Sequence, residues 1–150
     1  MELILWRHAE AVESLHDASR ALTDKGKLQA ERMAGFLSSR LPPNTRILVS
    51  PAVRAQQTAG ALSKKFITEP ALNTGASAQA VLEAASWPHA EGAVLLVGHQ
   101  PWLGEVAAKL MIGKTDYWSV KKGAVWWFSN RERNGEAQTV LRLVIAPEHV

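Results

Sequence analysis

Short runs of apolar residues alternate with longer segments of helical periodicity along this chain, and this alternation restricts the fold more than any other feature. The clearest runs lie at residues 2–6, 46–49 and 93–97. Continuous apolar runs of this length are typical of strands that are buried on both faces of a sheet. Because strands separated by helices usually pair in parallel, the pattern predicts an α/β fold.

Four segments between and after these strands are expected to be helical. Thr23 is a suitable N-cap for a helix over 24–40, in which Met33, Phe36 and Leu37 share one face. Pro101 suits the first turn of a helix that reaches about residue 112. The other two helices are expected at 52–65 and 77–87.

The C-terminal part of the chain has a different pattern. Two β-rich runs at 124–129 and 139–145 are joined by a segment that contains Asn134-Gly135, a strong signal for a tight turn. A short strand is also expected at 67–69. We therefore expect a three-layer α/β/α architecture with a mostly parallel central sheet, helices on both faces and a C-terminal antiparallel hairpin.

Length and composition exclude several classes of protein. The 150 residues fit one domain spanning 1–150, with no internal repeat or linker. The chain has no cysteine, which excludes disulfides and thiol nucleophiles, and no histidine–carboxylate set has the spacing of metal ligands. No apolar run reaches the roughly 20 residues that span a bilayer, and no basic leader precedes the first strand. We expect a complete, cytoplasmic protein without a metal or cofactor and without a membrane partner.

The net charge of +3 suits an anionic substrate. Basic residues are spread along the chain, with one local cluster at Lys121, Lys122, Arg131 and Arg133. No nucleic-acid-binding motif accompanies this charge, so no nucleic-acid partner is expected. We interpret the Lys121-Lys122 pair as a solvated turn, with contact to an acidic partner as the alternative.

Three of the expected strands are followed by cationic residues. Arg7-His8 follows the first strand, Arg54 lies shortly after the second, and His99 follows the strand at 93–97. The carboxyl ends of parallel strands meet at one edge of a sheet, where ligands bind. Arginine offers a planar fork of donors that matches phosphate, and helices that begin near residues 52 and 101 point their N-terminal amides to the same edge. The sequence therefore predicts a phosphate-binding site.

Three segments together resemble the motifs of the histidine phosphatase superfamily: Arg7-His8-Ala9, Ser50-Pro51-Ala52-Val53-Arg54-Ala55-Gln56-Gln57-Thr58 and Gly98-His99-Gln100-Pro101. The short chain and the segment 22–26 are similar to the SixA-type phosphohistidine phosphatase branch. The resemblance extends from residue 3 to about residue 130 and implies a phosphoglycerate mutase-like fold.

This resemblance implies a metal-independent phosphatase. His8 is expected to attack phosphorus and form a phosphohistidine intermediate that water hydrolyses, while Arg7, Arg54 and His99 hold the phosphoryl oxygens. The expected partner is a phosphohistidine-bearing protein of signalling or phosphotransfer, or a small phosphorylated molecule. Phosphate, vanadate or sulfate would bind as anions in the same pocket.

Two departures from the family pattern bear on activity and substrate. Ala9 stands where the family usually has glycine, so the turn must tolerate a side chain. The stretch 72–78 contains no carboxylate, whereas family members acting on sugar or acyl-glycerol phosphates carry an acid there. An alkoxide leaving group needs a proton donor, but an imidazole can already be protonated on its far nitrogen near neutral pH. The missing acid therefore favours phosphohistidine.

Two alternative functions remain open from the sequence. The first is a small-molecule phosphomonoesterase in which Glu10 or Glu69 acts as the acid. The second is a phosphate-recognising binding module without turnover. Trp102, which follows the His99 motif, is interpreted either as a wall of the pocket or as part of the core. Nothing in the sequence indicates an extensive apolar interface, so we expect a monomer.

Overall fold

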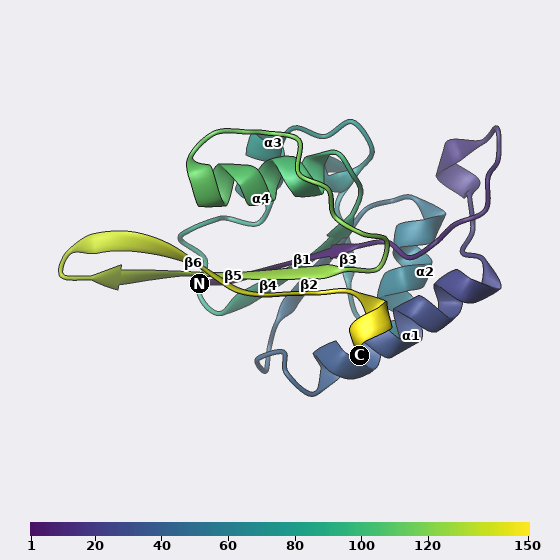
Figure 1. Cartoon of the computed structure of the whole chain (residues 1–150), viewed down its shortest axis with the longest axis horizontal. Coiled ribbons are helices and arrows are strands. Elements are labelled where there is room, and N and C mark those ends of the chain that lie inside the picture. Colours follow the sequence, from purple (N-terminus) through teal and green to yellow (C-terminus); the bar gives the residue numbers. More distant parts are fainter.

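A computed structural model describes all 150 residues, and a six-stranded sheet of order β3-β2-β4-β1-β5-β6 runs through its centre (Figure 1). The four strands β1 to β4 are mutually parallel, whereas β5 is antiparallel to β1 and β6 is antiparallel to β5. This arrangement confirms the mostly parallel sheet with a C-terminal hairpin. The strands are β1 Glu2–Arg7, β2 Arg46–Val49, β3 Ile67–Thr68, β4 Ala93–Gly98, β5 Val125–Arg133 and β6 Glu136–Ile145.

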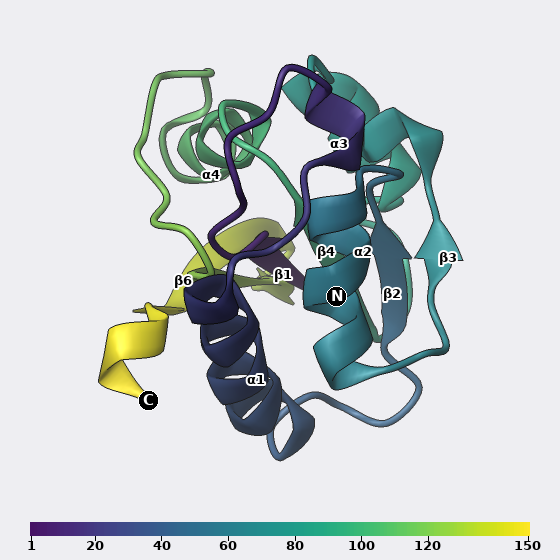
Figure 2. The same ribbon diagram turned by 90° about the vertical axis from the view of Figure 1, so that its right-hand side faces the viewer.

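Helices cover both faces of the sheet, as the three-layer prediction requires. Helices α3 and α4 lie on one side and α1 on the other in both views, with α2 packed beside α1 (Figures 1 and 2). None of them is long and apolar enough to cross a membrane. The helices are α1 Asp24–Ser38, α2 Val53–Leu62, α3 Ala78–Ala84 and α4 Trp102–Ile112; three short 3₁₀ turns are η1 Asp17–Ser19, η2 Pro70–Leu72 and η3 Pro147–His149.

Strand β1 divides the core into two parts because its successive side chains point to opposite faces. Leu3 and Leu5 pack in the apolar cluster beneath α3 and α4. Ile4 and Trp6 belong to the cluster on the side of α1 and α2. All four side chains are fully buried, which explains why this strand shows an unbroken apolar run in the sequence.

The ends of several elements differ from the sequence-based expectation. The hairpin strands extend well beyond 129 and 139, so that only Asn134 and Gly135 remain as the turn, with φ of 55° and 80°. Positive φ at both central residues matches the right-handed twist of the strands, and this lets the exposed polar segments on either side pair. Helix α3 ends at Ala84 rather than 87, because Ser86 has a φ of 56° that a helix cannot contain.

Trp102 lies in the core, which corrects the interpretation that it walls a pocket. Its side chain is fully buried, and its indole N–H donates to the carbonyl of Leu72 at 3.2 Å. The ring packs directly on Gly98, where an added Cβ would lie 1.9 Å from a ring carbon. Gly98 is therefore required by close packing at the end of β4.

We expect Gly98→Ala to lower the free energy of unfolding by about 1–3 kcal/mol, because the methyl group must displace a buried indole ring. Gly35→Ala is the matched control, since Gly35 lies within α1 and a Cβ there meets nothing within 4 Å. That control should raise the stability by about 0.5–1 kcal/mol through helix propensity. Urea unfolding monitored by circular dichroism measures both, and equal effects of the two substitutions would contradict the packing argument.

Candidate active site

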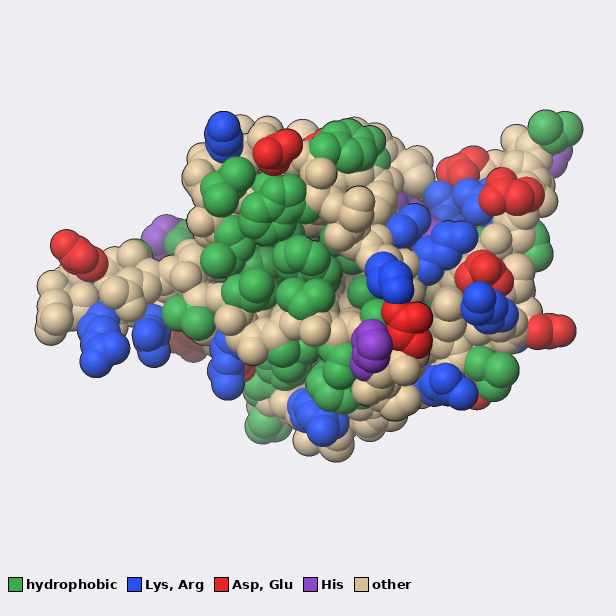
Figure 3. Space-filling view, viewed as in Figure 1, with side chains coloured by type: hydrophobic (Ala, Val, Ile, Leu, Met, Phe, Trp, Pro, Cys, Tyr) green, Lys and Arg blue, Asp and Glu red, His purple; other side chains and the backbone are tan.

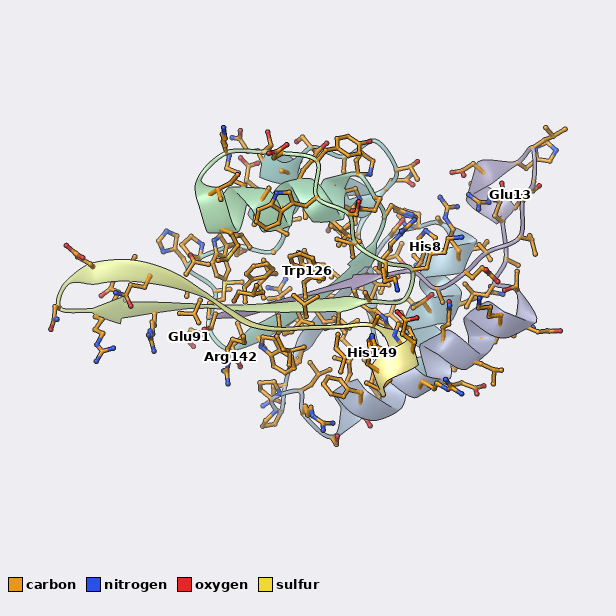
Figure 4. All side chains as sticks on the ribbon, viewed as in Figure 1. His8, Glu13, Glu91, Trp126, Arg142 and His149 are labelled. Atoms are coloured by element: carbon orange, nitrogen blue, oxygen red, sulfur yellow. The ribbon has the colours of Figure 1, made fainter.

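The sheet brings the end of β1 and the end of β4 side by side. Arg7 is the register partner of Gly98, and the backbone N–H of His8 donates to the Gly98 carbonyl at 3.0 Å. His8 and His99 therefore leave adjacent strands at one edge, with ring centroids 5.2 Å apart. Figure 4 shows His8 at this carboxyl end of β1. Arg54, in the first turn of α2, completes the group and donates from Nε to His8 Nε2 at 3.3 Å.

The hydrogen bonds of His8 define which nitrogen can react. Nδ1 lies 2.7 Å from the carbonyl oxygen of Ala9, an atom that only accepts, so Nδ1 carries the proton. Nε2 therefore holds the lone pair and faces Arg54. Burial lowers the pKa of His8 to about 3; the Ala9 carbonyl opposes this shift, and the charges of His99, Arg54 and Arg7 add to it. The ring is neutral near pH 7 and has the form of a nucleophile.

His99 is held by Ser50 at the end of β2. Its Nε2 lies 2.7 Å from Ser50 Oγ, and that oxygen accepts from the backbone N–H of Ala52 at 3.2 Å. The Ser50 hydroxyl can donate to Nε2, and in the tautomer that this contact requires the proton of His99 lies on Nδ1, the nitrogen without a partner in the protein. Burial, followed by the charge of Arg54, lowers the pKa of His99 to about 4. Neutral His99 thus offers an N–H donor beside His8.

Two buried donors in this cluster have no partner within the protein: Nδ1 of His99 and Nε of Arg7. Arg7 is anchored at its other end, where Nη1 donates to the carbonyl of Val120 at 2.7 Å. A buried donor without a partner costs about 1–3 kcal/mol. An anion placed between these groups would accept from both and would neutralise the charges of Arg7 and Arg54. The site is therefore suited to phosphate chemistry.

Asp17 in η1 is a partner of Arg54 that the sequence did not predict. Arg54 donates from Nη1 to the Asp17 carbonyl at 2.7 Å and from Nη2 to the Asp17 carboxylate at 3.1 Å. Arg20 binds the other carboxylate oxygen at 3.3 Å. Partial burial acts to raise the pKa of Asp17, but Arg54 and then Arg20 hold it below its usual value. Asp17 is therefore ionised and pairs with the guanidinium without serving as a proton donor.

Ala9 fits its position without strain. Its φ is not positive, and its side chain is buried in a small cluster with Leu22 and Ala30. Its backbone N–H donates to Thr58 Oγ1 at 3.0 Å, and that hydroxyl donates to the Arg54 carbonyl at 2.7 Å. Thr58 lies four residues after Arg54, one turn along α2, so its hydroxyl joins the segment after His8 to the helix that carries Arg54.

The two glutamates considered as acids are engaged elsewhere. The carboxylate of Glu10 accepts from the hydroxyl of Thr23 at 2.8 Å, beside the start of α1. The carboxylate of Glu69 accepts from the backbone N–H of Ala71 at 3.1 Å and caps η2. Neither carboxylate hydrogen-bonds to His8, Arg54 or His99.

Comparison with known proteins identifies the family. Residues 3–75 match the family model of the histidine phosphatase superfamily (branch 1). A phosphohistidine phosphatase SixA homolog from Haemophilus influenzae is 32% identical over 126 residues, which cover 73% of this chain and 77% of the relative. The chain belongs to the histidine phosphatase superfamily. It is a phosphatase of the SixA type.

Two further comparisons extend the similarity over most of the chain. An uncharacterized protein of Picosynechococcus is 35% identical over 127 residues, covering 78% of this chain and 77% of that protein. The structure of the protein histidine phosphatase SixA complexed with tungstate superposes with a TM-score of 0.83 at 24% identity and covers 99% of both chains. The second likeness confirms the phosphoglycerate mutase-like fold.

The low pKa values of His8 and His99 predict that neither ring titrates between pH 8 and pH 5 in the absence of an anion. NMR titration of the ring Cε1–H signals, assigned with His8→Ala, measures this directly. In the unfolded chain both rings take up protons near pH 6.5, whereas the folded rings do so only near pH 3–4. The free energy of unfolding therefore decreases as pH falls from about 6.5 to about 3–4, by up to about 1.4 kcal/mol per pH unit for each ring. A ring titrating near pH 6.5 would contradict the prediction.

Removal of the Asp17 charge should strengthen the binding of inorganic phosphate. Asp17→Asn keeps the carbonyl contact to Arg54 but removes a negative charge next to the anion site. Because the carboxylate is 56% exposed, we expect a modest gain in affinity of about two- to fivefold, measured by calorimetry. The control is Glu132→Gln, which also removes one negative charge but lies in strand β5 of the hairpin. Weaker phosphate binding by Asp17→Asn would instead show that the carboxylate is needed to orient Arg54.

Proposed function

We propose that this phosphatase hydrolyses phosphohistidine on proteins through a phosphorylated His8. The observation that carries the proposal is the neutral His8 ring, with its lone pair on Nε2, surrounded by Arg7, Arg54 and an N–H of His99. Tungstate, a phosphate-like anion, is bound in the SixA structure of the same fold. The cluster supplies both a nucleophile and donors for the phosphoryl oxygens.

The first step is attack of His8 Nε2 on phosphorus. A bond forms between Nε2 and phosphorus as the bond from phosphorus to the substrate imidazole breaks, and the electron pair leaves with that imidazole. Arg54 passes its hydrogen bond from Nε2 to a phosphoryl oxygen, while Arg7 Nε and His99 Nδ1 donate to others. Phosphoryl transfer depends chiefly on such positioning and charge stabilisation.

The second step is hydrolysis of phospho-His8. Water attacks phosphorus while the bond to Nε2 breaks and its electron pair returns to Nε2. Both protons of the water stay on the product, which leaves as dihydrogen phosphate, and the His8 ring is neutral again. The carbonyl of Ala9 remains hydrogen-bonded to Nδ1 throughout and keeps the reacting nitrogen directed at phosphorus. The protein cations supply the positive charge for both steps.

The leaving group favours phosphohistidine over phosphomonoesters. A departing imidazole that is protonated on its far nitrogen needs no further acid, whereas an alkoxide does. Glu10 and Glu69 are engaged in local hydrogen bonds, and Asp17 is ionised by its arginine partners. None of these carboxylates forms a hydrogen bond with His8, which supports phosphohistidine over phosphomonoesters.

The test is phosphate release from a phosphohistidine-bearing protein beside a panel of phosphomonoesters, with EDTA present. We expect release from phosphohistidine, and we expect His8→Ala to slow it by about a thousandfold or more because the nucleophile is lost. His89→Ala, at an exposed position away from the cluster, should retain full activity. Radiolabelled phosphate should be trapped on the wild-type chain but not on His8→Ala.

Three results would contradict the proposal. Full activity of His8→Ala would exclude the phospho-His8 intermediate. Comparable turnover of a phosphomonoester, lost in Glu10→Gln or Glu69→Gln, would show that one of these carboxylates is the acid. Bound phosphate with no release from any substrate would show a binding module.

A further inference from the structure

A polar cleft of about 500 Å³ lies beside the active site, between the start of α1, the loop at 121–123 and η3. Only two of the ten residues that line it are hydrophobic. Lys and Arg side chains gather on this face between the positions labelled His8 and His149 (Figures 3 and 4). Its charged lining residues are the cations Lys25, Arg32, Lys121 and Lys122 and the carboxylates Glu10 and Glu148.

The two carboxylates are already bound within the protein. Glu148 forms an ion pair with Lys121, and Glu10 accepts from the hydroxyl of Thr23. The hydrogen bond from Lys121 lowers the pKa of Glu148, and the charges of His149 and Lys25 act in the same direction. Lys25, on α1, therefore contributes to the same positive field as the loop on the other side of the cleft.

The remaining cations have no carboxylate of their own. No ion pair in the structure involves Lys25, Arg32 or Lys122. All three side chains are exposed. The cleft thus presents three cations that form no ion pair, and four cations against two carboxylates leave it a net positive charge even with Glu10 counted.

Backbone contacts fix this cleft relative to His8. The N–H of Gly123 donates to the His8 carbonyl at 3.1 Å, and the N–H of Arg7 donates to the Ala124 carbonyl at 3.0 Å. On its other side the loop packs on η3, where a Cβ at Gly123 would lie 2.7 Å from Pro147. The loop that carries Lys121 and Lys122 is therefore held in a fixed position relative to the backbone of His8.

We propose that this cleft binds acidic side chains next to the phosphorylated histidine of a protein substrate, an inference that rests on the proposed function. Exposed lysines spread over separate elements match several carboxylates on a protein surface, because charges of opposite sign guide association and orientation. A second phosphate site would instead need converging donors like those around His8. The cleft thereby favours acidic phosphoproteins over neutral ones.

The test compares two phosphohistidine peptides that differ only in flanking residues, three aspartates in one and three asparagines in the other. Phosphoramidate serves as the small substrate that reaches His8 alone. We expect wild type to prefer the aspartate peptide in kcat/KM by about tenfold, a preference that fades between about 20 mM and about 200 mM salt. The double variant Lys25→Gln/Lys122→Gln should lose this preference while its activity on phosphoramidate changes by less than about twofold.

The matched control is Lys64→Gln/Lys114→Gln, which removes the same charge at two exposed positions outside this cleft. It should retain the preference for the aspartate peptide. Affinities of the unphosphorylated peptides for His8→Ala, with and without the two cleft substitutions, test the cleft independently of turnover.

Several outcomes would overturn the proposal. One is that His8→Ala binds the two peptides with equal affinity. Another is that the control variant loses the preference for the aspartate peptide as much as the cleft variant does. A third is that the protein binds a short single-stranded RNA more tightly than the aspartate peptide. Absence of phosphoramidate and peptide turnover in the wild type would contradict the proposed function alone, since the binding measurement still decides whether the cleft recognises acidic groups.

Discussion

The parallel pairing of β1 with β4 is the constraint on which the active site depends. Both strands lie in the middle of the sheet, where β4 and the residues of β1 between Glu2 and Arg7 are buried, and their register places Arg7 opposite Gly98. One residue further along each strand, the chain leaves the sheet at His8 and His99. A slip of one residue would turn every side chain of β1 to the other face and separate the two rings. The hydrophobic core thus sets the geometry of polar groups that contribute nothing to it.

Burying this cluster costs the folded protein electrostatic and hydrogen-bonding free energy, and a bound substrate anion can offset part of that cost. Arg54 is 3% exposed and His99 is 2% exposed, and buried charge is expensive unless it is paired. The ion pair with Asp17 offsets part of the cost of burying Arg54. The two histidines are neutral, so they add no further positive charge. Arg7 Nε and His99 Nδ1 remain without partners. The same unpaired donors therefore destabilise the protein locally when no anion is bound and give the site its affinity for an anion.

The sequence was sufficient for the parts of the site that depend on strand ends. Arg7, His8, Arg54 and His99 follow buried apolar runs, and parallel strands bring such positions together without further information. Asp17 could not be predicted, because it lies in an irregular segment with no periodicity to place it opposite Arg54. Trp102 was ambiguous for a different reason. The burial of its ring, the hydrogen bond to the Leu72 carbonyl and the contact with Gly98 are three-dimensional facts that place the indole in the core.

The loop at 120–124 contacts both the candidate active site and the proposed recognition cleft. Its Val120 carbonyl anchors Arg7, its Gly123 N–H binds the His8 carbonyl, and the side chain of Lys121 pairs with Glu148 on η3. The contacts to Arg7 and His8 are made by the loop backbone, whereas the charge beside the cleft belongs to lysine side chains. Substitution of those lysines therefore changes the field around the entrance without removing a contact to the reacting residues. In the proposed mode of recognition, the charge of the cleft and the geometry around His8 are therefore set by different atoms of one loop.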